Sequence, residues 1–182
     1  YIWGMNLSFL KQWYWLGFWI LICIFCLVFF DGTGDSGDSI LHYLFAKEAP
    51  SHPELFFNHW AKPLYVLIMS PFAQFGFIGV KIANVLFSSL TIVFSFQVAK
   101  NLKLANYQLV PLFLIFAPLY ISLTLSGLTE PLFALVLILS LYLFQKNKLF
   151  WGSIILGFLP FVRSEGLFFL PIATVYLMHL KG

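Results

Sequence analysis

Long apolar runs separated by short polar breaks make up most of this 182-residue chain. An α-helix needs about 20 apolar residues to cross roughly 30 Å of hydrocarbon, and most of these runs approach that length. The pattern therefore predicts an all-α fold, a polytopic transmembrane helical bundle with about six spans. The predicted spans cover residues 12–30, 77–99, 107–125, 127–145, 149–162 and 166–180.

The last two predicted spans are short for a membrane crossing, and Arg163, Ser164 and Glu165 lie between them. Lipid offers no hydrogen-bond partners, so polar groups are tolerated at this depth only where they face protein or a water-filled cavity. We therefore expect the junction between these two spans to line a recess.

Residues 63–76 are also apolar, but Pro71 and Gln74 interrupt them. The positive-inside rule helps to place this segment, because lysines collect on the cytoplasmic side of a membrane. If the segment is interfacial or re-entrant, that side receives Lys11, Lys100, Lys103, Lys146, Lys148 and Lys181. All seven carboxylates then fall at or near the other side. We expect residues 1–182 to form one transmembrane module, the N-terminal part of a longer chain, with both termini cytoplasmic and an extracytoplasmic loop at 31–62.

The composition excludes several classes of protein. The chain is 61% hydrophobic and only 9% charged, whereas soluble domains carry about 25% charged residues. Its formal net charge of +3 comes with no basic stretch, so we expect no nucleic-acid partner.

The start of the 31–62 loop contains the first candidate chemistry. Residues 39–48 form an expected amphipathic helix, and helical spacing places Asp35, Asp38, Ser39 and His42 on one face of it. The opposite face carries Ile40, Leu41, Leu44 and Phe45 and should rest on lipid or protein. A structural alternative is that Asp35 or Ser36 caps this helix while Asp38 favours its positive N-terminal end.

Farther along this loop, the segments SHPEL and NHWAKPL bring His59 and Lys62 to the same surface. A mixture of aspartates and histidines can ligate a divalent cation such as Mg or Mn, with Asp35 and Asp38 as the ligands, although no spacing here matches a known metal site. The alternative is a set of interfacial anchors, with Trp60 at headgroup depth and Lys62 reaching a lipid phosphate.

Two further charged residues lie at predicted helix ends. Glu130 precedes Pro131 at the start of a span, where a helix cap explains it on structural grounds alone. Arg163 is the only arginine of the chain, and its fork geometry suits bidentate binding of a phosphate or carboxylate. Its structural alternative is an internal ion pair with Glu165 or Glu130.

Together these groups suit a lipid-linked phosphate. The lipid tail would lie in the bilayer, the phosphate near Lys62 and Arg163, and the cargo beside Asp38. If the cargo is a sugar, a carboxylate can act as general base on an acceptor hydroxyl while the cations stabilise the departing phosphate.

The motifs GDSGDS, HWAKPL, LTEPL and VRSEGL, in this order, resemble those of the GT-C superfamily of membrane glycosyltransferases, and most of all its bacterial protein-mannosyltransferase-like and aminoarabinose-transferase-like branch. The resemblance implies a polyprenyl-phosphate-linked sugar as donor, an acceptor glycan, lipid or protein, and an active site on the extracytoplasmic face of a bacterial inner membrane.

By this resemblance Asp38 is the catalytic loop acid, Asp35 is a second acid, and Lys62 and Arg163 bind the lipid phosphate. Further candidates for substrate binding are Glu165, Glu130, His42 and His59. The spacing of the two aspartates departs from a strict DxD motif and leaves the need for a divalent cation open.

Two other classes of protein fit parts of the pattern. A transporter or flippase of an anionic lipid or solute would use Arg163 and the broken hairpin as its binding site. A non-catalytic membrane assembly subunit would need every polar cluster only for structure.

Overall fold

The computed structural model describes residues 7–33, 35 and 37–181, and this part of the chain is all-α, with no β-strand. Its helices, in chain order, are α1 (Leu7–Phe29), α2 (Asp38–Glu48), the 3₁₀ helix η1 (Pro53–Phe57), α3 (Pro63–Ala73), α4 (Phe77–Asn101), η2 (Tyr107–Leu109), α5 (Val110–Ile115), α6 (Pro118–Thr124), α7 (Glu130–Gln145), α8 (Leu149–Gly157), α9 (Leu159–Val162), η3 (Ser164–Phe168) and α10 (Phe169–Lys181).

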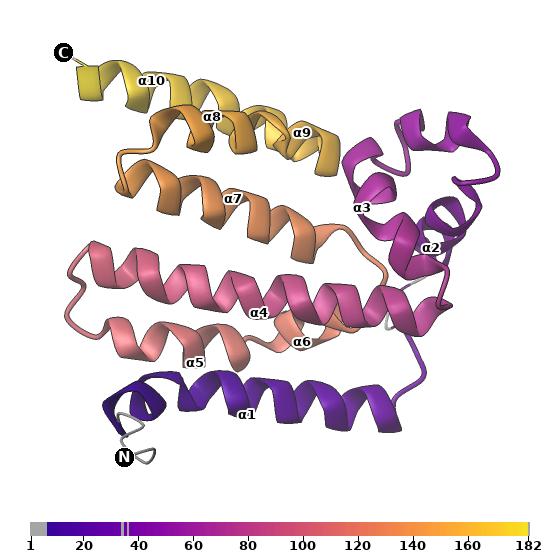
Figure 1. Cartoon of the computed structure of the whole chain (residues 1–182), viewed down its shortest axis with the longest axis horizontal. Coiled ribbons are helices and arrows are strands. Elements are labelled where there is room, and N and C mark those ends of the chain that lie inside the picture. The colour runs from indigo at the N-terminus through magenta and orange to yellow at the C-terminus, as the bar shows by residue number, and fades with distance from the viewer. Residues whose placement is uncertain (1–6, 34, 36, 182) are drawn as a thin grey trace, which may run out of the picture.

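Most of the helices lie side by side along the long axis of the molecule (Figure 1). Helix α4 is central and packs against α7 on one side and against α1 and α5 on the other. Helices α2 and α3 pack against each other at one end of this bundle. Helix α1 begins and α10 ends at the opposite end, so the bundle has a face with α2 and α3 and a face with both termini (Figure 1).

Two apolar clusters hold the bundle together. The larger one joins α3, α4, α7, α8 and α9 through buried side chains that include Met69, Ala83, Leu132, Leu135, Leu156 and Leu159. The other joins α1, α4 and α5 through Trp15, Trp19, Cys23, Ile92, Phe96 and Ile115. Close packing of these large side chains holds the helices together through many small van der Waals attractions.

The outward faces of the long helices are apolar as well. Large exposed side chains include Leu21, Phe25 and Val28 on α1, Leu86 and Leu90 on α4, Phe113 on α5, Phe150 and Trp151 on α8, and Ile172 and Val175 on α10. Soluble monomers rarely expose contiguous apolar surface of this kind, and its presence marks contact with a membrane or another protein.

Fewer helices are long enough to cross a membrane than the about six spans that the sequence predicts. Within the described residues, Phe77–Asn101 is the one helix that is long and apolar enough to cross a membrane by itself. The bent pair Tyr107–Ile115 and Pro118–Thr124 adds a second if its two pieces form one span. The core helix of a soluble protein can pass the same test.

Two predicted spans are interrupted in the structure. Residues 107–125 were predicted as one helix, but the chain bends by 65° between α5 and α6. The break falls at Ala117, which is extended with ψ 123° and precedes Pro118, as expected because proline disfavours the helical conformation in the residue before it. The 149–162 run is divided at Phe158, two residues before Pro160, into α8 and α9.

The carboxylates collect at one end of the bundle, whereas the cations occur at both ends, with Lys47, Lys62, Lys81 and Arg163 at the same end as the carboxylates. The elements that carry the carboxylates, namely the segment after α1, α2, η1, the start of α7 and η3, lie on the α2 and α3 face (Figure 1). Lys100 and Lys103 lie at the far end of α4, and Lys146 and Lys148 between α7 and α8, on the face with the termini.

Candidate functional site

A cavity of about 430 Å³ opens on the α2 and α3 face of the bundle. Four separate stretches of chain contribute to it: the start of α2 with the residues before it, the residues before α3, the start of α7, and the turn after α9. The lining residues are Asp35, Asp38, His42, Trp60, Lys62, Leu128, Thr129, Glu130, Arg163, Ser164 and Glu165. Every candidate site residue from the sequence is therefore present except His59, which is exposed elsewhere on the loop.

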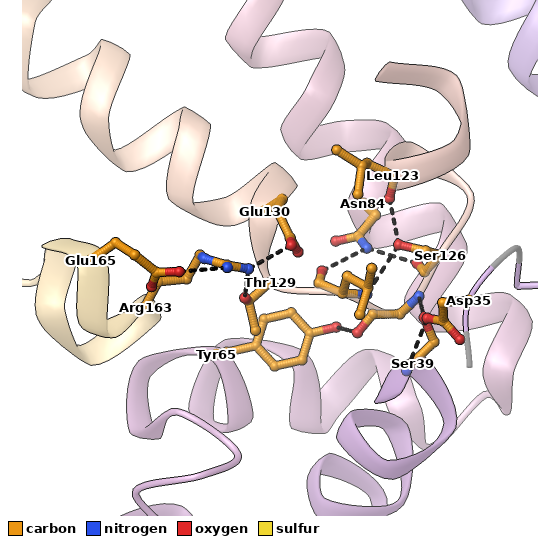
Figure 2. Close-up of polar contacts among 12 residues, drawn as sticks. Asp35, Ser39, Tyr65, Asn84, Leu123, Ser126, Thr129, Glu130, Arg163 and Glu165 are labelled. Carbon is orange, nitrogen blue, oxygen red and sulfur yellow. Dashed lines mark hydrogen bonds and ion pairs between the residues drawn. The ribbon is translucent and has the colours of Figure 1, made fainter. Parts of the chain in front are cut away.

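Arg163 connects two of these stretches through ion pairs (Figure 2). Its Nη1 lies 2.5 Å from Oε1 of Glu130 and donates to Oγ1 of Thr129 across 3.2 Å. Its Nη2 lies 2.8 Å from Oε1 of Glu165. The internal ion pairs that the sequence offered as an alternative are thus both formed, and the guanidinium ties the start of α7 to η3.

The position of Arg163 depends on a close approach of two backbone segments. Arg163 is extended at the end of α9, with φ −153° and ψ 143°, and its carbonyl accepts a hydrogen bond from the N–H of Gly166. A Cβ atom at Gly166 would lie 2.5 Å from the carbonyl carbon of Leu159 and 2.6 Å from the nitrogen of Pro160. Only glycine fits here without moving α9 away from η3.

The segment before α7 is fixed from three helices by residues that sequence reasoning missed in this role (Figure 2). Tyr65 of α3 donates its hydroxyl to the carbonyl of Gly127 across 2.5 Å, and Ser39 of α2 accepts from the Gly127 N–H across 2.9 Å. Asn84 of α4 donates to the carbonyls of Ser126 and Leu128 across 2.8 and 3.3 Å. An asparagine inside a long apolar run is the signal that marks such a site.

Asp35 caps α2. One of its carboxylate oxygens accepts hydrogen bonds from the Gly37 N–H and the Thr33 hydroxyl, each across 3.0 Å. The other accepts from the N–H and the hydroxyl of Ser39. Partial burial acts to raise the pKa of Asp35, but the hydrogen bonds from Ser39, Gly37 and Thr33 outweigh it and lower that pKa. Asp35 lies outside the helix, so it does not extend the polar face as the sequence predicted.

Asp38 is the first residue of α2, and its side chain is exposed at the cavity. Within the described part of the chain, no hydrogen bond or ion pair engages its carboxylate. Of the two candidate acids, Asp38 is therefore the one whose oxygens are available to a ligand.

Beyond the exposed Asp38, the polar residues Ser39 and His42 of α2 are buried instead of facing solvent. His42 is only 7% exposed; it stacks on Trp60 with ring centroids 4.8 Å apart and meets the edge of Tyr65. Burial lowers the pKa of His42 although Asp38 and Glu130 act to raise it. The imidazole is therefore neutral at pH 7, while Ile40, Leu41 and Leu44 are the exposed side of the helix.

Lys62 reaches the cavity from a strained backbone position. Its φ of 68° is rare for a residue with a side chain, and it precedes Pro63, which restricts it further. Asn58 supports this turn by accepting hydrogen bonds from the N–H groups of Trp60 and Ala61, each across 3.0 Å. Strain of this kind persists where surrounding structure holds it, and such positions cluster at functional sites.

A buried lysine that the sequence prediction did not use holds the segment leading to Asp35. Lys81 of α4 is 4% exposed, and its Nζ donates to the carbonyls of Phe30, Asp31 and Gly32 across 3.1–3.2 Å. Cations at a helix C-terminus satisfy carbonyl groups that lack helical partners. Lys81 therefore fixes the direction in which the chain leaves α1.

The cavity carries more negative than positive charge. Its carboxylates are Asp35, Asp38, Glu130 and Glu165, and its cations are Lys62 and Arg163. No group of three or more His, Cys, Asp or Glu side chains that could hold a metal ion occurs in the described residues. The oxygens of Asp35, one of the two ligands that the sequence offered for a cation, already accept hydrogen bonds.

An apolar groove adjoins the polar cavity. It has a volume of about 480 Å³ and lies between η1, α3 and the α8–α9 segment. Its lining consists of Pro53, Phe56, Phe57, Pro63, Leu64, Leu67, Phe158 and Phe161. Pro63 directly follows Lys62, and Phe161 lies two residues before Arg163. The two pockets share no lining residue, but residues close in the chain to both cations line the apolar groove.

Comparison of the chain with protein-family models, with curated proteins and with solved structures found no match.

Proposed function

We propose that this chain belongs to a membrane glycosyltransferase that moves a sugar from a polyprenyl-phosphate donor to an acceptor glycan, lipid or protein at the extracytoplasmic face. The observation that carries the proposal is that Lys62 and Arg163 line a polar cavity while their close chain neighbours Pro63 and Phe161 line an apolar groove. A ligand with a long apolar tail, an anionic phosphate and a polar cargo matches an apolar groove, two cations and a polar cavity.

In this proposal the chain spans the membrane about six times, with both termini cytoplasmic. The apolar outer faces of α1, α4, α5, α8 and α10 support a lipid surrounding. Lys100, Lys103, Lys146 and Lys148 lie at the end of the bundle away from the carboxylates, and they support the orientation because lysines mark the cytoplasmic side. The exposed apolar side of α2 supports an interfacial position for that helix.

In the proposed complex the donor lies with its tail in the apolar groove and its sugar in the polar cavity. The first units of its tail lie in the groove beside Leu64, Leu67 and Phe161, where apolar contacts replace lipid. The phosphate then meets Lys62 and Arg163, and the sugar enters the cavity toward Asp38 and Trp60. Trp60 is 45% exposed, so part of its ring is available to a sugar.

Asp38 is the general base in the proposed reaction. It accepts the proton of an acceptor hydroxyl while that oxygen attacks the anomeric carbon of the donor sugar. The bond between this carbon and the phosphate oxygen breaks, and polyprenyl phosphate leaves with the bonding electrons. Lys62 and Arg163 stabilise the charge that develops on the phosphate. Asp35 is less suited as the base, because both of its oxygens already accept hydrogen bonds. These bonds also lower its pKa, which makes it a weaker proton acceptor.

The test is sugar transfer and donor binding by the full-length protein in nanodiscs. Asp38→Asn should lower transfer by about 10²–10⁴-fold, the usual contribution of a general base, and leave donor binding nearly unchanged. Arg163→Ala should abolish the thermal stabilisation that the donor confers on the wild type. Asp31→Asn is the matched control. Asp31 is an exposed aspartate in the same loop, but it does not line the cavity.

The other classes of protein predict different results. A transporter would tolerate Asp38→Asn better than Arg163→Ala, and an assembly subunit would tolerate both. Transfer by the Asp38 variant at the wild-type rate would disprove the assignment of the base, and no stabilisation by any polyprenyl-phosphate sugar would disprove the donor.

A further inference from the structure

The two carboxylates that bind Arg163 are held very differently. Glu130 is in the first turn of α7, its side chain is 33% exposed, and the preceding segment is fixed by Tyr65, Ser39 and Asn84. Glu165 is on the short 3₁₀ helix η3, and its side chain is 56% exposed. Exposed ion pairs contribute little to stability and exchange easily with solvent. Glu165 is therefore the partner that Arg163 can release.

The charge of the cavity makes such a release necessary for an anionic ligand. Four carboxylates outnumber two cations there, and Arg163 already has a carboxylate oxygen at each of its terminal nitrogens. A phosphate that approached this arrangement would gain little attraction from Arg163. It would also meet the unfavourable charge of Glu165 at short range.

We propose that Glu165 occupies the phosphate position of the site, and that a lipid phosphate binds by displacing its carboxylate from Nη2 of Arg163. This inference rests on the proposed function, since it concerns the phosphate of the same donor. Arg163 keeps its contacts to Glu130 and Thr129 through Nη1, so it stays in place when Glu165 leaves. Nη2 then binds the phosphate.

Lys62 and Ser164 complete this phosphate position. The ammonium of Lys62 donates to the Ser164 hydroxyl across 2.9 Å, and it has further N–H groups to offer. Both residues line the cavity beside Arg163. Lys62 also lies near enough to Glu165 to act on its carboxylate electrostatically, so the Lys62 ammonium is close to the position that Glu165 leaves.

A competing carboxylate has a consequence for turnover. The donor phosphate is a diester with one negative charge, whereas the product polyprenyl phosphate is a monoester with a second ionisation near pH 6. The product therefore binds two cations more strongly than the donor does. By returning to Arg163, Glu165 opposes this stronger binding and assists release of the product.

The test is binding of geranylgeranyl phosphate to the full-length protein in nanodiscs, measured by titration calorimetry. Glu165→Gln keeps the shape of the side chain and removes its charge, so the dissociation constant should fall by about tenfold, the effect of one charge at short range near a protein surface. The gain should shrink as salt rises from about 0.05 to 0.5 M, because exposed charges are screened. Glu165→Ala should show the same gain.

Glu54→Gln is the matched control. Glu54 is also an exposed glutamate in the first turn of a 3₁₀ helix, with the ring Nδ1 of His52 3.5 Å from its carboxylate, but it does not line the cavity. Its substitution should leave the dissociation constant unchanged. A similar gain in both variants would attribute the effect to the net charge of the protein and overturn the inference.

The remaining outcomes separate this inference from the proposed function. If the wild type binds the probe and both Glu165 variants bind it equally or more weakly, the displacement is disproved while the donor assignment stands. If neither the wild type nor the Glu165 variants bind it, the donor assignment and the displacement are both wrong.

Discussion

The ammonium of Lys62 donates a hydrogen bond to the hydroxyl of Ser164 across 2.9 Å, although the two residues are 102 positions apart in the sequence. Both residues line the polar cavity, so this contact joins the turn before α3 to η3 within the site. Because Lys62 adopts a backbone conformation with φ 68°, the fold accepts strain in order to aim this side chain at η3.

Lys62→Gln should weaken binding of geranylgeranyl phosphate by about tenfold, since one cation near a protein surface contributes on the order of 1–2 kcal/mol to an anion at short range. Titration calorimetry at low and high salt would measure this loss. Lys47→Gln is the control, because Lys47 is an exposed lysine on α2 that stacks over Tyr43, outside the cavity. Equal affinities of wild type and Lys62→Gln would remove Lys62 from the site.

Asp35→Ala should lower the free energy of unfolding by about 1–2 kcal/mol, the usual cost of losing a helix cap. The variant leaves the N–H groups of Gly37 and Ser39 without their acceptor. Thermal unfolding in detergent would measure the loss, with Asp38→Ala as the control, because no hydrogen bond in the described residues depends on the Asp38 carboxylate. Equal losses in the two variants would contradict the different roles given to these aspartates.

The pH dependence of stability should follow the same carboxylate. Hydrogen bonds hold the pKa of Asp35 below its unfolded value of about 3.9. The stabilisation is therefore complete above that unfolded value and is lost as the pH falls through the lower pKa of the folded state. Between about pH 5 and pH 2 the melting temperature of the wild type should drop more than that of Asp35→Asn. If the melting temperatures of the two proteins fell in parallel with pH, the pKa of Asp35 would be the same in the folded and unfolded states.

Local patterns predicted the helices, because apolar runs and helical spacing act over a few neighbouring residues. The all-α fold is confirmed, and α4 begins at Phe77 as predicted. The break between α5 and α6 was missed because the apolar run continues through Ala117 and Pro118 without a polar residue. The number of membrane spans, about six, stays a prediction.

The candidate site could be found in part because charged residues are rare in such a chain. Arg163 and Glu130 were predicted as site residues because they are charged and lie at the ends of apolar runs. In the structure they form an ion pair. The supporting contacts of Tyr65 and Asn84 with the segment before α7 could not be predicted, because they depend on how α3 and α4 pack. The sequence offered a cap role for Asp35 as the alternative to a place on the polar face, and the alternative holds because α2 begins at Asp38 and leaves Asp35 to cap it.

Gly166→Ala should disrupt the site from a distance, because the new Cβ atom would clash with the backbone of Leu159 and Pro160 at 2.5–2.7 Å. Overpacking of this kind costs about 1–3 kcal/mol, and relief requires η3 to move away from α9. Since Arg163 and Glu165 both lie at this junction, binding of geranylgeranyl phosphate should weaken along with thermal stability.

The matched control for this variant is Gly157→Ala. Gly157 is the last residue of α8, and a Cβ atom there would meet no neighbouring atom within 4 Å. Alanine is also the better helix former, so this variant should be as stable as the wild type or more stable. A Gly166→Ala variant that melts and binds like Gly157→Ala would show that the close approach of α9 and η3 does not position Arg163. A loss confined to Gly166→Ala would show that this backbone contact sets the position of the guanidinium.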